Sequence, residues 1–290
     1  MTERRPKAGY ACETVIVDDE YVTRRAPAGE GVFPVYDLAL QTAVVNAVSV
    51  PAPAPAHFAD GTMTMPFIAG PIPNDFTPLD PWLKGLPDDA ARRRVWESTI
   101  DTIAAIHREP LLPGLRTGLA AELDYWAEYL DWMDGAPAAL RDAFAWCRDR
   151  APLATEPPAV LLWGDVRYGN VIYDEATLTP KAILDWDMVS AGPPEMDIAW
   201  LVALEAVGQE LSGMAVPGFG SRDDAIALFE ARLGRTLVDF DWYETFALVR
   251  ASAISTRIVL LHERAGERSL FKVGDDPTLK AARTRIGAVG

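Results

Sequence analysis

The chain has 290 residues, of which 49% are hydrophobic and 24% charged, so it can bury the core of one bilobal unit or of two small domains. Its formal net charge is −15, and such a surface repels phosphate backbones, which argues against nucleic acid as a partner. The two cysteines, Cys12 and Cys147, lie far apart and outside any C-x-x-C pair, so neither a zinc site nor a disulfide framework is expected.

No apolar segment of signal-peptide type follows the basic N-terminal residues, and no uninterrupted run of about eighteen apolar residues occurs. The closest candidate, 246–261, is interrupted by Arg250 and Arg257. We therefore expect a cytoplasmic protein with no membrane contact. The sequence leaves its oligomeric state open.

The N-terminal part of the chain has the composition of strands with one helix. β-branched residues on either side of an acidic turn favour a hairpin, apolar residues at helical spacing favour a helix, and alternating Pro-Ala excludes both structures. In chain order we predict a hairpin of 14–17 and 21–23, an amphipathic helix over 34–48, a stiff connector over 51–56 and a strand over 62–68.

After residue 70 helical patterns dominate and only short strands interrupt them. The predicted helices span 88–108, 116–133, 137–150, 194–207, 221–234 and 240–263. The predicted strands span 160–163, 171–173 and 182–184, and loops rich in Pro and Gly span 109–117 and 213–220. A small strand-rich part therefore precedes a larger helical part, which defines an α+β fold.

The most informative segment is V-L-L-W-G-D-V-R-Y-G-N-V-I-Y, followed downstream by A-I-L-D-W-D. An apolar strand ends at Asp165, Asn170 opens a second strand five residues later, and a third strand ends at Asp185. Phosphoryl transfer needs a carboxylate that accepts the proton of the attacking hydroxyl, and oxygen ligands for the Mg²⁺ that bridges the phosphates. Two carboxylates and one amide oxygen at neighbouring strand ends can supply both.

The pattern G-D-x-x-x-x-N followed by L-D-W-D resembles the aminoglycoside phosphotransferase family, a branch of the protein-kinase-like fold. The resemblance implies that Asp165 is the catalytic base and that Asn170 and Asp185 are the Mg²⁺ ligands. Asp187 resembles the second acid of the family's D-x-D/E pair. Asp197, in M-D-I-A-W-L, resembles the aspartate that braces the catalytic loop.

The same resemblance implies a bilobal fold with an N-lobe over 1–68 and a helical C-lobe over 69–290. The segment A-G-Y-A-C-E-T-V resembles the family's degraded glycine loop and contains Gly9. Arg24, in Y-V-T-R-R, resembles the phosphate-binding cation. In the hinge-like M-P-F-I-A-G, Pro66 would offer its carbonyl and Ile68 its N–H to the nucleotide base.

The chain departs from the family pattern at several positions. Trp163 replaces the usual His, Arg24 replaces Lys, and Gln41 replaces the Glu that would pair with the cation; Asp37, one helical turn earlier, is an alternative partner. The segments G-F-G-S-R and W-Y-E-T-F-A-L-V-R resemble a bacterial subgroup that also occurs fused to acyl-CoA dehydrogenase modules.

Other interpretations of single residues remain open. Asp and Asn often occupy turns, Arg24 could be a solvated surface arginine beside Arg25, and Pro66 could merely end an edge strand. His107, at a helix C-terminus, is interpreted as structural.

The resemblance implies an ATP- or GTP-dependent, Mg²⁺-requiring transfer of the γ-phosphate to a small-molecule hydroxyl. The acceptor could be an aminoglycoside, another antibiotic, an amino alcohol or sugar, or a hydroxyacyl thioester. The alternative is a catalytically weak pseudokinase that binds nucleotide, which Gln41 and the poor glycine loop favour. A metal-dependent hydrolase ranks lower because the acidic cluster has no His ligands.

Overall fold

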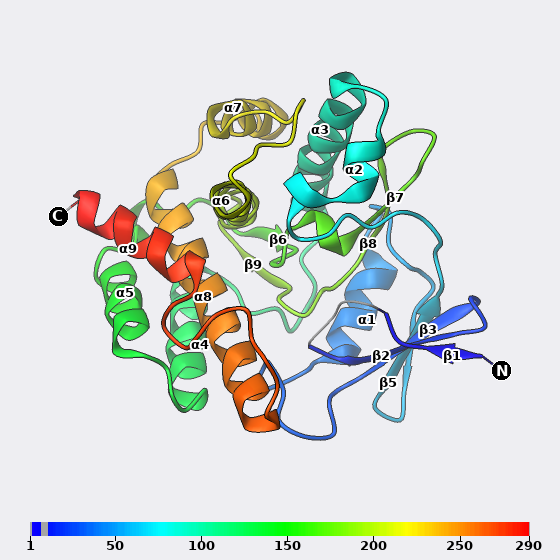
Figure 1. Cartoon of the computed structure of the whole chain (residues 1–290), viewed down its shortest axis with the longest axis horizontal. Helices are drawn as coiled ribbons and strands as arrows, with labels where there is room; N and C mark the ends of the chain where they lie inside the picture. Colours follow the sequence, from blue (N-terminus) through cyan, green and yellow to red (C-terminus); the bar gives the residue numbers. More distant parts are fainter. Residues whose placement is uncertain (1, 7–10, 290) are drawn as a thin grey trace.

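The computed structural model describes residues 2–6 and 11–289. A small antiparallel sheet with one helix lies at one end of the molecule, and a larger, mostly helical part forms the rest (Figure 1). This is the predicted α+β arrangement of a kinase-like fold. The Gly9 segment lies outside the described residues.

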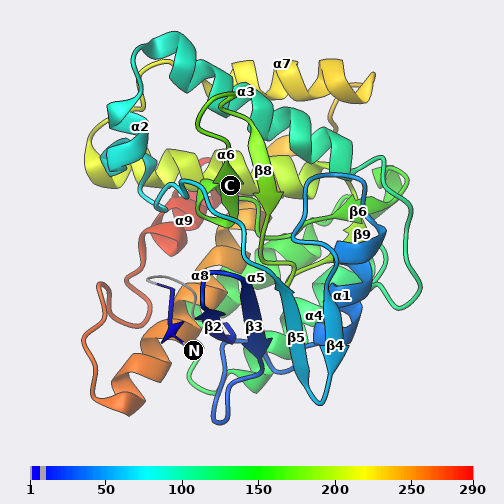
Figure 2. The ribbon, with the colours of Figure 1, turned by 90° about the vertical axis from the view of Figure 1, so that its right-hand side faces the viewer.

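The small sheet has the strand order β1-β2-β3-β5-β4 (Figure 2). Its strands are β1 Glu3–Arg4, β2 Glu13–Val17, β3 Tyr21–Arg25, β4 His57–Ala59 and β5 Thr62–Pro66. The predicted hairpin is confirmed as β2–β3. β4 was not predicted, although Asp60 and Gly61, both with positive φ, form the tight turn that joins it to β5 and that Asp-Gly pairs favour.

Helix α1, Leu38–Ala47, lies against β4 and β5 (Figure 2). It begins four residues later than predicted because Asp37 is its N-cap, with a carboxylate that accepts a hydrogen bond from the Leu40 N–H at 2.9 Å.

All six predicted helices of the larger part are present. The helices there are α2 Pro81–Gly85, α3 Asp89–Ile106, α4 Leu119–Trp132, α5 Ala138–Asp149, α6 Glu195–Ser212, α7 Arg222–Leu233, α8 Phe240–Ala265 and α9 Pro277–Val289. Short 3-10 turns are η1 Thr77–Leu79, η2 Leu153–Thr155 and η3 Tyr168–Asn170. α2 and α9 were not predicted, although Asp276 before Pro277 is a clear start signal for α9: its carboxylate accepts from the Leu279 N–H at 2.9 Å.

Two short antiparallel strand pairs lie in the segment from 160 to 192. β6, Val160–Leu162, pairs with β9, Ser190–Gly192, and β7, Val171–Tyr173, pairs with β8, Pro180–Ile183. The three strands predicted here are confirmed, and β9 is additional. These pairs bring the ends of β6 and β8 together.

The core of the larger part is built on α8, which packs against α6 and α9 (Figure 1). Trp96, Trp126, Trp163 and Trp186 are among the largest fully buried side chains, as expected for core tryptophans. By length and composition α8 alone among the helices of the described part could cross a membrane. However, 67% of its apolar window is buried inside the fold, which is typical of a core helix.

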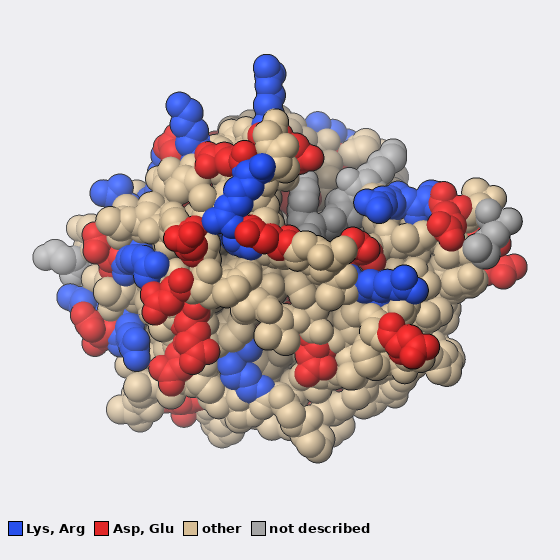
Figure 3. All heavy atoms as spheres, turned by 90° about the horizontal axis from the view of Figure 1, so that it is seen from below, with Lys and Arg blue, Asp and Glu red and all other residues tan. Residues whose placement is uncertain are grey.

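Acidic and basic side chains are mixed in small groups over the face seen in Figure 3. Among the residues drawn in colour there, the lysines and arginines do not merge into one basic patch. That face therefore lacks the electrostatic footprint typical of nucleic-acid binding.

Candidate functional site

A sharp turn after β6 places Asp165 at the centre of the site. Gly164 has a φ of +92°, and a Cβ at this position would lie 2.3 Å from the backbone oxygen of Met188. Only glycine fits both the conformation and the close approach. The turn therefore holds Asp165 directly beyond a buried strand.

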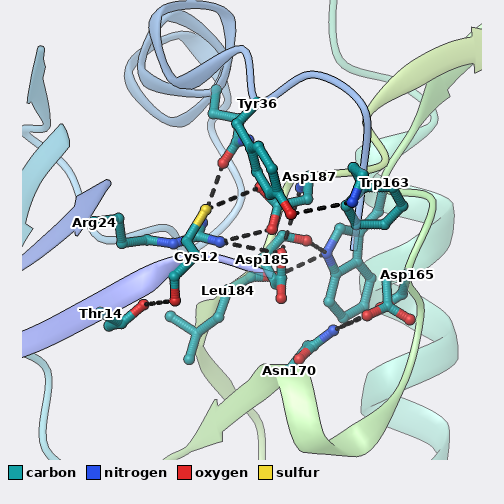
Figure 4. Close-up of polar contacts among 12 residues, drawn as sticks. Cys12, Thr14, Arg24, Tyr36, Trp163, Asp165, Asn170, Leu184, Asp185 and Asp187 are labelled. Carbon is teal, nitrogen blue, oxygen red and sulfur yellow. Dashed lines mark hydrogen bonds and ion pairs between the residues drawn. The ribbon is translucent and has the colours of Figure 1, made fainter. Parts of the chain in front are cut away.

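Asn170, the last residue of η3, folds back onto Asp165. Its Nδ2 donates to the Asp165 backbone oxygen at 3.0 Å and to the carboxylate Oδ2 at 2.8 Å (Figure 4). Its Oδ1 accepts no hydrogen bond from any described residue, so this oxygen is available to a ligand. The sequence prediction that Asn170 lies beside Asp165 is confirmed.

Sequence reasoning missed a cation beside the predicted base. The Arg167 Nε donates to Asp165 Oδ2 at 2.9 Å, and its Nη1 donates to Asp75 Oδ1 at 2.7 Å. Arg167 could have been noticed as the cation inside the G-D-x-x-x-x-N loop, whereas Asp75 lies 92 residues earlier and gave no signal. Burial raises the pKa of Asp165 above its ordinary value although Arg167 opposes the shift, and a raised pKa improves proton acceptance.

Asp185 follows β8 in a left-handed backbone conformation, with a φ of 58°. The Trp163 Nε1 donates to the carbonyl oxygens of Leu184 at 2.9 Å and Asp185 at 3.1 Å (Figure 4). The Leu184 N–H in turn donates to the Asn170 carbonyl oxygen at 2.8 Å. Trp163 therefore orients the loop that carries Asp185.

Arg24 reaches the same site from β3. It is 9% exposed, and its Nη2 lies 2.8 Å from Asp187 Oδ2 and 3.4 Å from Asp185 Oδ1 (Figure 4). The interpretation of Arg24 as a solvated surface arginine is therefore wrong. Its Nη1 donates to Gln41 Oε1 at 3.1 Å, and the Gln41 Nε2 donates to Asp187 Oδ1 at 2.5 Å.

The counter-charge of Arg24 thus comes from Asp185 and Asp187, with Gln41 bridging Arg24 and Asp187. The expectation that Asp37 could replace a missing Glu is wrong, because the Asp37 carboxylate caps α1 instead. A Gln at position 41 fits here because it can accept from the guanidinium and donate to the carboxylate at once.

The two neighbouring carboxylates have pKa values shifted in opposite directions. Burial raises the pKa of Asp187 to about 7, and the negative charge of Asp185 adds to the shift. Burial alone would raise the pKa of Asp185 as well, but Arg24 and the hydrogen bonds from Asp187 outweigh it, so this pKa is lowered. Asp185 is therefore the carboxylate that stays ionised and can bind a cation.

Asp197, at the start of α6, fixes the catalytic loop from behind. Its Oδ2 accepts from the Trp163 N–H and its Oδ1 from the Gly164 N–H, both at 2.9 Å. The predicted bracing role is confirmed. His107 Nε2 lies 3.0 Å from Asp197 Oδ2, so His107 is structural through this buried pair.

The hinge-like segment follows β5. Pro66 lies opposite Tyr21 of β3, whereas the pairing of β5 with β4 ends at Thr64. The Phe67 N–H donates to the Glu20 carbonyl oxygen at 2.9 Å. Because backbone groups alternate in direction along a strand, the backbone nitrogen and carbonyl of Pro66 point away from β3, to a side where no strand of the small sheet pairs with them. The proline therefore removes no ladder hydrogen bond. The nucleotide contacts of Pro66 and Ile68 stay predictions.

The oxygen atoms at the site suit Mg²⁺. The Oδ1 of Asn170 and the Oδ2 of Asp185 accept no hydrogen bond within the described part of the chain. The described part of the chain contains no group of three or more His, Cys, Asp or Glu side chains placed to hold a metal ion. One carboxylate and one amide oxygen, completed by phosphate and water, match the way Mg²⁺ is bound beside nucleotides.

A cavity of about 510 Å³ opens beside Asp165, with walls from α6, α8 and the segment between α8 and α9. Glu205 and Tyr168 lie on one side of it, and the Tyr168 hydroxyl donates to Glu205 Oε1 at 2.6 Å. Burial raises the pKa of Glu205 to about 7. No sequence pattern pointed to this pair.

From the raised pKa of Glu205 we predict that the protein loses stability as the pH rises. Its folded-state pKa of about 7 exceeds the ordinary value of 4.5, so the folded state retains the proton longer than the unfolded state does. The free energy of unfolding should fall from about pH 4.5 to about pH 7 and then level off. Glu205→Gln keeps an acceptor for Tyr168 and should raise stability at about pH 8 by about 1–3 kcal/mol.

Urea unfolding of parent and variant at about pH 5 and about pH 8 checks this linkage. Glu210→Gln, an exposed change on the same helix, is the matched control and should behave like the parent. If the free energies of unfolding of Glu205→Gln and the parent differ by the same amount at both pH values, the proposed linkage to Glu205 is wrong.

The fold and the cluster around Asp165 together define a kinase-like phosphotransferase that acts on hydroxyl groups. The model of the phosphotransferase enzyme family matches residues 2–233, and the chain belongs to this family.

Solved structures of similar fold have low sequence identity to this chain. A candidate aminoglycoside phosphotransferase of Ralstonia eutropha JMP134 has a TM-score of 0.66 at 18% identity, over 98% of this chain and 89% of that one. APH(2″)-IIIa in complex with GDP and kanamycin has a TM-score of 0.58 at 16% identity, over 99% and 93%.

A macrolide 2′-phosphotransferase of Brachybacterium faecium has a TM-score of 0.51 at 16% identity, over 98% of this chain and 91% of that one. At these identities the likeness shows the fold. The resemblance to the subgroup fused to acyl-CoA dehydrogenase modules stays a prediction.

Proposed function

We propose that the protein transfers the γ-phosphate of ATP or GTP to the hydroxyl of a small molecule, with Asp165 as the base. The observation that carries this proposal is the cluster itself: Asp165 and Asn170 from one loop, Asp185 after β8 and Arg24 from β3 lie close together at one site (Figure 4). A cavity large enough for a small ligand opens directly beside Asp165.

In this mechanism Asp165 accepts the proton of the acceptor hydroxyl. The hydroxyl oxygen attacks the γ-phosphorus, and the bond between the γ-phosphorus and the oxygen that links it to the β-phosphate breaks. Asn170 and Arg167 hold the carboxylate in place through hydrogen bonds to Oδ2. The other oxygen, Oδ1, accepts no hydrogen bond from the described residues and is the one that would face the hydroxyl. Positioning of this kind and electrostatic stabilisation supply most of the catalysis in phosphoryl transfer.

Mg²⁺, when bound by Asn170 and Asp185, would neutralise charge on the nucleotide phosphates. Arg24 is held by Asp187 and Gln41 with its guanidinium beside Asp185, which suits a phosphate-binding cation. The network also supplies the counter-charge that Gln41 lacks, which weakens one argument for a pseudokinase.

The proposal is tested by nucleotide turnover of the purified protein over a panel of hydroxyl acceptors, with and without Mg²⁺. Acceptor-dependent release of ADP or GDP that chelation of the metal abolishes is the expected result. Nucleotide binding without any acceptor-dependent turnover would favour the pseudokinase alternative.

We expect Asn170→Ala and Asp185→Ala each to weaken Mg²⁺-dependent nucleotide binding, Asp185→Ala more strongly. A carboxylate brings charge to the ion, whereas an amide brings only a dipole. Calorimetric titration of ATP with and without Mg²⁺ measures the difference. If both variants bind Mg-ATP like the parent, the metal is held elsewhere.

We expect Ile68→Pro to weaken nucleotide binding by about 1–3 kcal/mol, because a proline removes the N–H that would pair with a ring nitrogen of the base. Pro66→Ala should be nearly silent, since position 66 would contribute only its carbonyl. Calorimetric titration decides it, with circular dichroism as the check on folding. Parent-like affinity of a folded Ile68→Pro variant would mean that the base binds elsewhere.

A further inference from the structure

The walls of the cavity beside Asp165 are apolar over most of their extent. α6 and α8 both contribute to its walls, and the segment between α8 and α9 lines it as well. The side chains that line these walls include Trp200, Leu204, Leu211, Ile254, Ile258 and Phe271. Leu211 is 45% exposed and Leu270, also at the cavity, is 84% exposed. Exposed apolar side chains gathered at one opening mark a surface that binds an apolar partner.

Apart from the Mg²⁺ position at Asp185, the charges of the cavity do not favour a cationic ligand. Each carboxylate that lines it already faces a donor within the protein: Asp75 and Asp165 face Arg167, Asp185 and Asp187 face Arg24, and Glu205 faces Tyr168. At the opening lies Arg268, an exposed cation that forms no ion pair with another described residue.

From these walls and charges we infer that the acceptor is a predominantly apolar alcohol without positively charged groups. The inference rests on the proposed function, because it identifies the cavity as the acceptor site. The hydroxyl would lie at Asp165 and the apolar body against the cavity walls formed by α6 and α8. An ammonium group would be placed either against apolar walls, where an unpaired charge is strongly disfavoured, or beside Arg268, where like charges repel. A polycation such as kanamycin therefore does not fit this site.

Calorimetric titration in the presence of Mg-ADP tests the inference independently of catalysis. The probes are octanol and its ω-amino analogue aminooctanol, which differ by one terminal ammonium group, together with kanamycin. Octanol should bind, aminooctanol should bind about tenfold or more weakly, and kanamycin should not bind. Aminooctanol or kanamycin binding as tightly as octanol, or no binding of octanol, would overturn the inference.

A charge-switch variant locates the binding site. Leu204 is a partly buried wall residue on α6. Leu204→Glu should lower the ratio of the octanol affinity to the aminooctanol affinity by about tenfold, because the new carboxylate would pair with the ammonium group. Leu153→Glu, at an exposed leucine outside the cavity, is the matched control and should leave the preference unchanged. The same preference in Leu204→Glu as in the parent would overturn the placement.

Phosphoryl transfer is scored separately in the same preparations. Selective binding of octanol without phosphorylation of any acceptor would leave the ligand class standing and contradict the phosphotransferase function. Phosphorylation of kanamycin would overturn the ligand class and leave that function standing.

Discussion

Asp165→Asn should lower the rate of phosphoryl transfer by about two to four decades while leaving the fold and nucleotide binding nearly unchanged. An amide cannot accept the hydroxyl proton, yet it has the shape of the carboxylate and keeps an oxygen for the hydrogen bonds from Arg167 and Asn170. Single-turnover kinetics with saturating acceptor measure the rate of the chemical step.

The matched control is Asp142→Asn, an exposed change of the same kind on α5, which should retain the parent rate. Calorimetry should show ATP affinity within about threefold of the parent for Asp165→Asn, since the metal ligands are untouched. Near-normal turnover by Asp165→Asn would remove Asp165 from the role of base.

Asp197→Ala should lower the free energy of unfolding by about 3–5 kcal/mol. The carboxylate is 1% exposed and accepts from two backbone N–H groups, of Trp163 and Gly164, besides contacting His107. Removing it leaves these buried groups without an acceptor, and each unsatisfied group is costly. Denaturant unfolding followed by circular dichroism measures the loss.

The variant Asp197→Asn distinguishes the contribution of the hydrogen bonds to stability from the contribution of the negative charge. Its amide oxygen can still accept from one of the two N–H groups, so we expect a loss of stability clearly smaller than that of Asp197→Ala. A loss below about 1 kcal/mol in Asp197→Ala would show that the catalytic loop is held by other contacts.

The motif-bearing part of the site was predictable because its residues adjoin short strands at fixed spacing. Asp165 and Asp185 follow the ends of β6 and β8, Asn170 directly precedes β7, and the helix that begins after Pro194 places Asp197 behind them. The strict requirement for glycine at position 164 was visible only as the W-G-D pattern. The structure gives its reason: a positive φ and contact with the Met188 backbone.

The rest of the site depends on tertiary contacts that no local pattern encodes. Arg167 meets Asp75 across 92 residues, and Asp187 contacts Gln41 of α1, beside the small N-terminal sheet. The substitute for the missing Glu was sought at Asp37 because that residue is one helical turn away, but the carboxylate comes from a loop 146 residues downstream of Gln41. The missed β4 and α9 are different, because their turn and capping signals were present in the sequence.

The central claim is tested most directly by following the γ-phosphate itself. ATP labelled at the γ-position is incubated with Mg²⁺, the protein and each acceptor of the panel, and the label is traced by separating acceptor from nucleotide. The proposed function predicts label on the hydroxyl of at least one acceptor with the parent protein and an initial rate of labelling at least about a hundredfold lower with Asp165→Asn. Label that stays on the nucleotide with every acceptor, or that is transferred equally well by Asp165→Asn, would contradict it.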